Sequence, residues 1–515
     1  MGRKRNILNR KSILKATALV VGLTLVSKAL GFLKSIIQAS YFGATIYTDA
    51  YNIANGFVSN ILFMLVTAIS VSFVPLYIQS KQANREKEFA TKAITFLTIG
   101  AVIVSALLIA AAPPIITIQV PSYSPEQKII TIKYFRVLVL GLIFALNAYM
   151  FTSVLNAEKI YGYSAVGSVV NSLTLIVFTF LFAKTLGVWV LVISMSLSYF
   201  IQWMILYIRG RRYASISLKY GLYDEKIRLL LMQSLPILLG QATVEINQVI
   251  DRALLLSVGE GVVTAVSYSA ILNEFVIQLM GQPIQTVLFT ELSEAGAAKD
   301  TKRISSLISN SYKIILIIGI PIVVVMLFGS YDIVRIVYGH GKFSAEAVKN
   351  CAVGLQMYSL CLLPVSVKKV LTKAYYAQNE TRRPMIIGVF EVMLNIGLSI
   401  WWVRYWGVYG VVGATAAASF TFIIVMLADY NRKYDCVLSI KEIFSYWNII
   451  VGTIIVMITM RYFSMLPINS ALLSFVCKTA MAFLVFYLSL IITGEPSFIY
   501  VLQKAMQIIK RKTGK

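Results

Sequence analysis

The sequence predicts an all-α polytopic membrane protein, because three features of the chain agree. Apolar stretches recur along nearly all of its 515 residues, and 58% of the residues are hydrophobic. The mean hydropathy is +0.77, which is far too high for an ordinary soluble domain. The loops between the apolar stretches alternate between strongly basic and nearly uncharged, as the two sides of a membrane protein do.

About fourteen stretches are long enough to cross a hydrocarbon core about 30 Å thick, which needs roughly 20 residues of helix. The first follows a basic segment, as in a signal peptide, but it is too long and lacks an A-x-A cleavage site, so a retained helix is expected. In chain order the predicted spans are residues 17–40, 51–78, 89–115, 130–152, 161–183, 186–208, 228–256, 262–290, 306–328, 351–376, 385–404, 407–429, 445–465 and 469–493.

The distribution of Lys and Arg predicts the orientation of these spans. Alternate loops and both termini hold about 30 basic residues, against about 7 in the opposite loops. Cytoplasmic segments carry this excess, so both termini are expected in the cytoplasm of a bacterial cell, with the chain in its plasma membrane. The same excess accounts for the net charge of +25 without any nucleic-acid binding.

The longest basic loop predicts how the spans are organised. It separates two groups of six spans, and related six-span halves around a central cavity are a common transporter plan. The expected organisation is an N-terminal six-helix bundle at 1–208, a cytoplasmic basic linker at 209–228, a C-terminal six-helix bundle at 229–430, and two additional helices with a basic tail at 431–515.

Ionisable residues inside the predicted spans are the candidate functional residues, because charge at that depth is costly and usually faces a cavity. Basic residues outnumber acids, which favours an anionic substrate. The substrate-binding candidates are Lys28 and Lys34 in the first span, Asp49 in the second, Glu274 in the eighth, and Lys368, Lys369 and Lys373 in the tenth.

Motifs of enzyme chemistry are not found in the sequence. It holds neither a Gly-x-x-x-x-Gly-Lys-Ser/Thr phosphate loop nor a His-Glu-x-x-His helix, and its one histidine, His340, lies between glycines in a loop. Four scattered cysteines have no metal-ligand spacing. A transporter that uses an ion gradient, the membrane potential or the substrate gradient is therefore expected, not an enzyme.

Several stretches carry a resemblance to a known family. They are Ser27–Lys34, Tyr41–Ala44, Thr48–Tyr51, Asn247–Asp251, Tyr268–Phe275, Lys369–Leu371, Ala374–Ala377 and Glu380–Pro384. In order and spacing they resemble the MviN/MurJ family, the lipid II flippases of the MOP exporter superfamily, over nearly the whole chain.

This resemblance implies a flippase that moves an undecaprenyl-pyrophosphate-linked cell-wall precursor, lipid II, between leaflets by alternating access. It also implies a groove for the lipid tail at the last two helices and partners among cell-wall synthesis proteins. Lys28 and Lys34 stand where the family has cavity arginines, Asp49 matches an essential acid, and Glu274 matches a cavity glutamate. Lysine lacks the bidentate fork with which arginine grips pyrophosphate, so these positions offer point charges.

The resemblance also implies where sodium would bind, although no cofactor is required. Some family members bind Na⁺ between spans 7, 11 and 12, and here Asp251, Asn395 and Thr415 fit that site. Ser399 stands where those members have a further acid. A polar contact between helices is the alternative reading of these residues.

Three other functions stay open at this point. A related flippase could carry a capsular, teichuronic or O-antigen-type repeat unit. A drug/cation antiporter of the same superfamily is disfavoured by the basic spans, because they would repel cations. A membrane glycosyltransferase would need a long outer loop with catalytic residues, and the outer loops are short.

Overall fold

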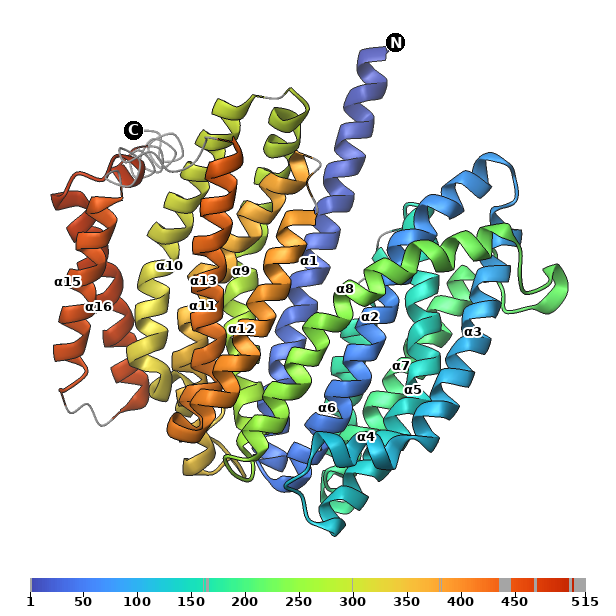
Figure 1. The fold of residues 1–515 in the computed structure, drawn as a ribbon, viewed down its shortest axis with the longest axis horizontal. Helices are drawn as coiled ribbons and strands as arrows, with labels where there is room; N and C mark the ends of the chain where they lie inside the picture. The colour runs from blue at the N-terminus through green and yellow to red at the C-terminus, as the bar shows by residue number, and fades with distance from the viewer. Residues whose placement is uncertain are drawn as a thin grey trace. The chain divides into compact units, whose positions relative to one another are not determined.

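A computed structural model describes residues 2–160, 162–163, 166–298, 300–378, 380, 382–434, 446–466, 470–499 and 503. All regular structure in this part of the chain is helical (Figure 1). Twelve of these helices are long and apolar enough to cross a membrane. Helix α1 and the shorter α15 lie over the two remaining predicted spans. The prediction of an all-α protein with about fourteen membrane helices is confirmed.

The helices form two compact units. The first comprises Met1–Thr264 with Gly341–Phe343. Its helices are α1 (Gly2–Phe42), α2 (Ile46–Gln82), α3 (Glu86–Ala110), α4 (Ala112–Gln119), α5 (Pro125–Ala157), α6 (Val166–Leu186), α7 (Trp189–Gly210), the short 3₁₀ helix η2 (Leu218–Tyr220), α8 (Glu225–Leu256) and the first residues of α9 (Val262–Ala297).

The second unit comprises Ala265–His340 with Ser344–Lys515. It holds the rest of α9, then α10 (Thr301–Val337), α11 (Ala345–Ala377), α12 (Arg382–Trp406), α13 (Val408–Tyr434), α15 (Trp447–Phe463) and α16 (Ala471–Ile492).

The two units do not divide where the sequence predicted a linker. The predicted boundary is the basic segment 209–228, whereas the compact units part between Thr264 and Ala265. Helix α8 follows the basic segment but packs against α2 inside the first unit. The predicted domain organisation stays a prediction. Helix α8, which the sequence placed in the C-terminal bundle, lies in the first compact unit.

Polar caps fix where several helices begin. Ser124 accepts a hydrogen bond from the backbone of Gln127, whose side chain accepts one in return, and Pro125 occupies the first turn of α5. Ser344 caps α11 through the backbone N–H of Ala347. Such caps satisfy amide groups that the first helical turn leaves without partners.

Two tight helical hairpins turn on glycine. Gly187 joins α6 to α7 with φ of 53°, and Gly407 joins α12 to α13 with φ of 52°. Both glycines donate a backbone hydrogen bond to a carbonyl four residues earlier. A left-handed residue at a helix end favours glycine, which has no Cβ to clash. The same turn therefore occurs at corresponding places in the two sets of spans.

Each unit has its own apolar core. In the first, Phe73 of α2 stacks on Phe89 of α3 with ring centroids 5.4 Å apart. In the second, buried side chains of α9, α10, α11 and α13 form one cluster, and those of α10, α15 and α16 form another. Figure 1 shows α15 and α16, in red, beside α10. The last two helices are thus attached to the rest of their unit through α10.

Candidate functional site

The first-span lysines of α1 have different surroundings. Lys34 is half-buried and its ammonium donates a 2.9 Å hydrogen bond to Oδ1 of Asn171 in α6. Asn171 in turn donates to Oγ of Ser198 in α7, at 3.0 Å. Lys28, six residues earlier, is exposed. The bond to Asn171 fixes the position of the ammonium group of Lys34. Its partner is a neutral carboxamide, so the bond does not offset the positive charge of Lys34.

Asp49 caps the start of a different helix. Its side chain is 0% exposed and accepts hydrogen bonds from the backbone N–H groups of Gly261 and Thr264, at 2.6 and 2.8 Å. The hydroxyl of Thr264 donates a third bond, at 2.6 Å. These groups lie at the N-terminus of α9, where free amides and the helix dipole favour an anion. Asp49 was predicted to bind substrate, and that role stays a prediction.

The start of α9 needs glycine as well as Asp49. Gly261 has φ of +76°, and a Cβ at this position would lie 2.5 Å from the carbonyl oxygen of Ala44. Asn52, one turn after Asp49, donates a 2.9 Å bond to the hydroxyl of Thr264. The contact between α2 and the start of α9 is therefore sterically and electrostatically specific.

The lysines of the tenth span, in α11, do not act as one cluster. Lys368 forms an ion pair with Glu391 of α12 and lies 4.3 Å from the ring centroid of Phe422 in α13. Ser419 donates a further bond to Glu391, at 3.2 Å. Lys369 and Lys373 are half-buried, and their like charges act on each other. An acid therefore offsets the charge of Lys368.

Glu274, the acid predicted in the eighth span, is exposed on α9. One of its carboxylate oxygens accepts a 2.7 Å hydrogen bond from Nε2 of Gln278, four residues on. This is a contact within one helix. Glu274 is thus accessible, and its bond to Gln278 leaves the rest of the carboxylate free to meet water or a ligand.

Two of the three predicted sodium ligands are neighbours. Asn395 is buried in α12 and donates a 3.0 Å bond to the hydroxyl of Thr415 in α13, while Ser399 donates to Oδ1 of Asn395 at 3.3 Å. Neutral oxygens of this kind suit a hard cation. Asp251 belongs to the first unit, where Asn247 donates a 3.3 Å bond to it. Among the described residues there is no group of three or more His, Cys, Asp or Glu that could hold a metal ion.

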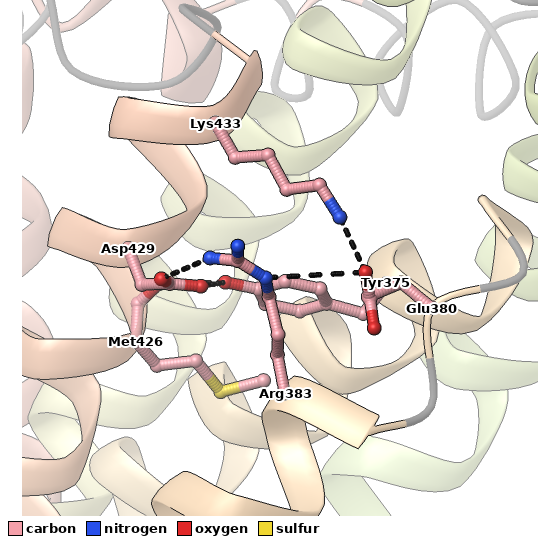
Figure 2. A network of polar contacts seen from close by, with 6 residues as sticks. All are labelled: Tyr375, Glu380, Arg383, Met426, Asp429 and Lys433. Atoms are coloured by element: carbon pink, nitrogen blue, oxygen red, sulfur yellow. Dashed lines mark hydrogen bonds and ion pairs between the residues drawn. The ribbon is translucent and has the colours of Figure 1, made fainter.

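A polar network joins the ends of three helices of the second unit (Figure 2). The hydroxyl of Tyr375 in α11 donates to Asp429 of α13 at 2.7 Å, and Arg383 of α12 donates to the other oxygen of Asp429 at 2.5 Å. Glu380 pairs with Lys433 and lies 3.9 Å from Nε of Arg383. The hydrogen bond from Lys433, with the charges of Lys433 and Arg383, lowers the pKa of Glu380.

A smaller network marks the start of α8 in the first unit. Asp224 caps the helix through the backbone N–H of Ile227, at 2.9 Å, and accepts a 2.7 Å bond from Lys92 of α3. Burial opposes the charged form of Asp224, but these hydrogen bonds and the charge of Lys92 lower its pKa overall. Sequence reasoning assigned no role to Asp224, Lys92, Tyr375 or Asp429.

Sequence reasoning also missed a nearly buried ion pair between α10 and α16. Lys478 of α16 lies 2.6 Å from Oδ2 of Asp332 in α10, and Ser474 donates to the same oxygen at 2.7 Å. Both charged side chains are only about one-eighth exposed, at 12% and 13%. The signal was available, because Lys478 lies inside a predicted span, where a charge is rare.

Comparison with known proteins places the chain in a family. The model of the family described as "Lipid II flippase MurJ" matches residues 38–480. The chain belongs to the MurJ family.

Curated MurJ relatives match at low identity over most of their length. The chain is 26% identical over 446 residues to a probable lipid II flippase MurJ of Treponema pallidum, covering 83% of each protein. It is 23% identical over 399 residues to the lipid II flippase MurJ of Burkholderia cenocepacia, covering 73% of this chain and 76% of that protein.

Solved structures of the MurJ fold and its superfamily agree with this assignment. A lipid II flippase MurJ in an inward closed conformation matches with a TM-score of 0.80 and 21% identity, covering 97% of this chain and all of that one. An inward-facing multidrug MATE transporter of the MOP superfamily matches with a TM-score of 0.68 and 16% identity, over 79% of this chain and 94% of that one. Both likenesses are below 25% identity and show the fold alone.

Proposed function

We propose that this chain is a flippase for lipid II, the undecaprenyl-pyrophosphate-linked precursor of peptidoglycan, and not an enzyme. Membership of the MurJ family carries this proposal, because that family is described as lipid II flippases. The alternatives were another lipid-linked glycan, a drug/cation antiporter and a membrane enzyme. The MATE transporters share the fold with this chain but only at low identity, so they lend the antiporter reading no support beyond the fold.

Lys34 is the residue that we propose binds the pyrophosphate group of the substrate. A phosphate ligand needs a positive charge that no acid already compensates, and the partner that the structure gives Lys34 is the carboxamide of Asn171. Lys28, Lys369 and Lys373 would supply additional positive charge to the head group, and Glu274 would meet the glycan or peptide. Lys368 is offset by Glu391 and would act mainly in structure.

The transport cycle follows from binding that differs between conformations. A ligand shifts a conformational equilibrium only by its difference in affinity for the two states. We propose that the anionic head group is bound from the cytoplasmic leaflet, the side that the basic loops and both termini are predicted to face. The isoprenoid tail would stay in lipid along α15 and α16, which expose large apolar side chains such as Ile454, Ile458 and Leu484.

We also propose that Na⁺ binds where Asn395 contacts Thr415. Nδ2 of Asn395 donates to the hydroxyl of Thr415, and Oδ1 of Asn395 accepts from the hydroxyl of Ser399. Asp251 would add the one charge of the ligand set. When bound, Na⁺ would link the ion gradient to the conformation of this site. Flipping that is indifferent both to the sodium gradient and to Asp251→Asn would remove sodium from the mechanism.

The experiment that tests the function is replacement of the host flippase. A strain depleted of its own MurJ should grow when it expresses this chain, and lipid II should become accessible at the outer face of its membrane. Reconstituted protein should also move labelled lipid II across vesicles. A chain that reaches the membrane in normal amount, yet neither restores growth nor flips lipid II, would contradict the proposal.

A further inference from the structure

A pocket of 250 Å³ lies between α2 and α8 in the first unit. Six apolar side chains line it, and two polar residues, Asn60 of α2 and Glu245 of α8, complete the lining. The apolar residues are Phe57, Ile61, Met64, Ala242, Ile246 and Val249. The proposed steps of lipid II transport do not involve this pocket.

Both polar residues present a buried atom that lacks a hydrogen-bond partner. These atoms are Oε2 of Glu245, an acceptor, and Nδ2 of Asn60, a donor, and neither has a partner among the described residues. Buried polar atoms in native proteins nearly always have partners, so two in one pocket require an explanation. A water molecule in the pocket could donate to Oε2 and accept from Nδ2, and a proton delivered by water would neutralise the unpaired carboxylate oxygen.

The position of Glu245 makes an unpaired charge there costly. It is the twenty-first residue of α8, a helix of 32 residues, so it lies about 30 Å from the N-terminal end and about 16 Å from the C-terminal end. Carboxylates at membrane depth either pair with a base or become neutral. Protonation would remove the charge of Glu245 and turn its oxygen into a donor.

The charges around Glu245 are few. On α8 itself the guanidinium of Arg252, seven residues on, shares the same face and packs over Gly56 of α2, where an added Cβ would lie 2.3 Å from Nη1. The helices packed against α8 are α2, α3 and α4. Their charged residues are Asp49 and Lys81 in α2 and Glu86, Lys87, Glu88 and Lys92 in α3, while α4 has none.

Those charges lie far along the helices from the pocket. Asp49 and Lys81 are 11 and 21 residues from Asn60 in α2, about 16 and 32 Å along the axis. Lys92 of α3 pairs with Asp224, at the opposite end of α8 from Arg252. Arg252 is therefore the charge that acts most directly on Glu245.

We propose that Glu245 is a proton-binding site, and that its protonation and deprotonation accompany the conformational change of transport. Oε2 takes up H⁺ from water on one side of the membrane, which changes the side chain from −1 to neutral. It releases H⁺ to water on the other side when α2 and α8 move apart and the pocket becomes hydrated. This inference rests on the proposed function for its transport step, but not for proton binding itself.

Carbodiimide labelling tests proton binding without any transport assay. Dicyclohexylcarbodiimide reacts with protonated carboxyl groups in apolar surroundings, so the full-length protein is treated at several pH values and the labelled peptides are measured by mass spectrometry. Glu245 should label near pH 7, and its labelling should fall about tenfold for each pH unit above its titration midpoint. Glu274, exposed and bonded to Gln278, is the matched control and should stay unlabelled.

Two variants sharpen the labelling result. Glu245→Gln should abolish the label at this peptide while the protein keeps its elution volume and melting temperature. Arg252→Gln removes the nearby positive charge, so labelling of Glu245 should persist to higher pH. If Glu245 labels no more than Glu274 at any pH where the protein is folded, the proton site is refuted.

Flipping in vesicles tests the coupling. Wild-type protein should flip labelled lipid II several-fold faster with a proton gradient than without one, whereas Glu245→Gln should be insensitive to the gradient. Equal wild-type rates with and without the gradient would refute coupling. If wild-type protein flips no lipid II at all but Glu245 still labels, the proposed function fails and the proton site stands.

Discussion

Two lysines at membrane depth, Lys34 in the first unit and Lys368 in the second, have opposite electrostatic surroundings. Lys34 donates to the neutral carboxamide of Asn171, while Lys368 pairs with Glu391 and lies over Phe422. Both are lysines inside predicted spans, and the sequence offered no reason to separate them. The comparison teaches that a basic residue attracts an anion only if no neighbouring acid already offsets its positive charge.

The strongest test of this comparison is removal of Lys34. Lys34→Ala should lower flipping about 10- to 100-fold, because a charge-assisted hydrogen bond to a ligand is worth roughly 1.5–3 kcal/mol. Lys34→Arg should retain activity, since it keeps the charge. Flipping of labelled lipid II in vesicles measures both variants, with protein amount determined by immunoblot. Lys34→Ala flipping at the wild-type rate would contradict the assignment of Lys34 to the pyrophosphate.

A second test concerns the anchoring of α9 by Asp49. Asp49→Asn keeps the size of the side chain but replaces one acceptor oxygen with an amide, so it should lose about 1–3 kcal/mol of stability and most of its activity. Gly261→Ala should be at least as damaging, because its Cβ would meet the Ala44 carbonyl oxygen. Melting temperature in detergent and growth complementation report the two effects. Gly259, two residues earlier and in ordinary contact with Val262, is the control: Gly259→Ala should be mild.

The third test concerns Lys368, whose charge is offset by Glu391 and which is therefore expected to act in stability and not in substrate binding. Lys368→Met or Glu391→Gln alone should destabilise the protein by about 1–3 kcal/mol, and the double variant should recover most of that loss, because both halves of the pair are gone. Flipping by the double variant should stay within a few-fold of wild type. A double variant as inactive as Lys34→Ala would show that Lys368 binds substrate after all.

The smallest expected effect is at the start of α8, where the carboxylate of Asp224 has a lowered pKa. A carboxyl whose pKa is lower in the folded state contributes its full stabilisation above the ordinary pKa of 3.8, and that contribution is lost as the pH falls further, through the lowered pKa of the folded state. Asp224→Asn should therefore lower the melting temperature at about pH 7 by an amount worth less than ~1 kcal/mol. The difference from wild type should shrink as the pH falls from about 7 to below 3.8, and a difference that stays constant over this range would show that the pair is not electrostatic.

The sequence was sufficient to predict the helices. Length and hydropathy located the helices, because in lipid a backbone has to satisfy its hydrogen bonds within a helix. Twelve of the described helices could cross a membrane, and α1 and the shorter α15 lie over the other two predicted spans. Asn395 and Thr415 were expected to be neighbours, either as sodium ligands or through a polar contact between helices, and they are hydrogen-bonded; the sodium site stays a prediction. Family membership, which the residue motifs indicated, is confirmed by the family match.

Contacts between different helices were harder to predict. Helical periodicity tells which residues share a face of one helix but not which faces of two helices meet. Lys368 was a candidate from the sequence and Glu391 lies inside the predicted span 385–404, yet their pairing depends on how α11 packs against α12. The capping of α9 by Asp49 was missed for the same reason, since its donors are backbone amides about 210 residues away in the chain.

The pair between Asp332 and Lys478 bears on how the protein enters the membrane. Helix α16 is made late in synthesis, and a lysine near the middle of a lone helix costs roughly 2.5–3.5 kcal/mol to place in the bilayer. Asp332 lies in α10, which is synthesised before α16 and presents the carboxylate that offsets this cost. Asp332 therefore lowers the cost of holding Lys478 in the membrane once α16 packs against α10, and a chain lacking Asp332 should insert α16 less efficiently.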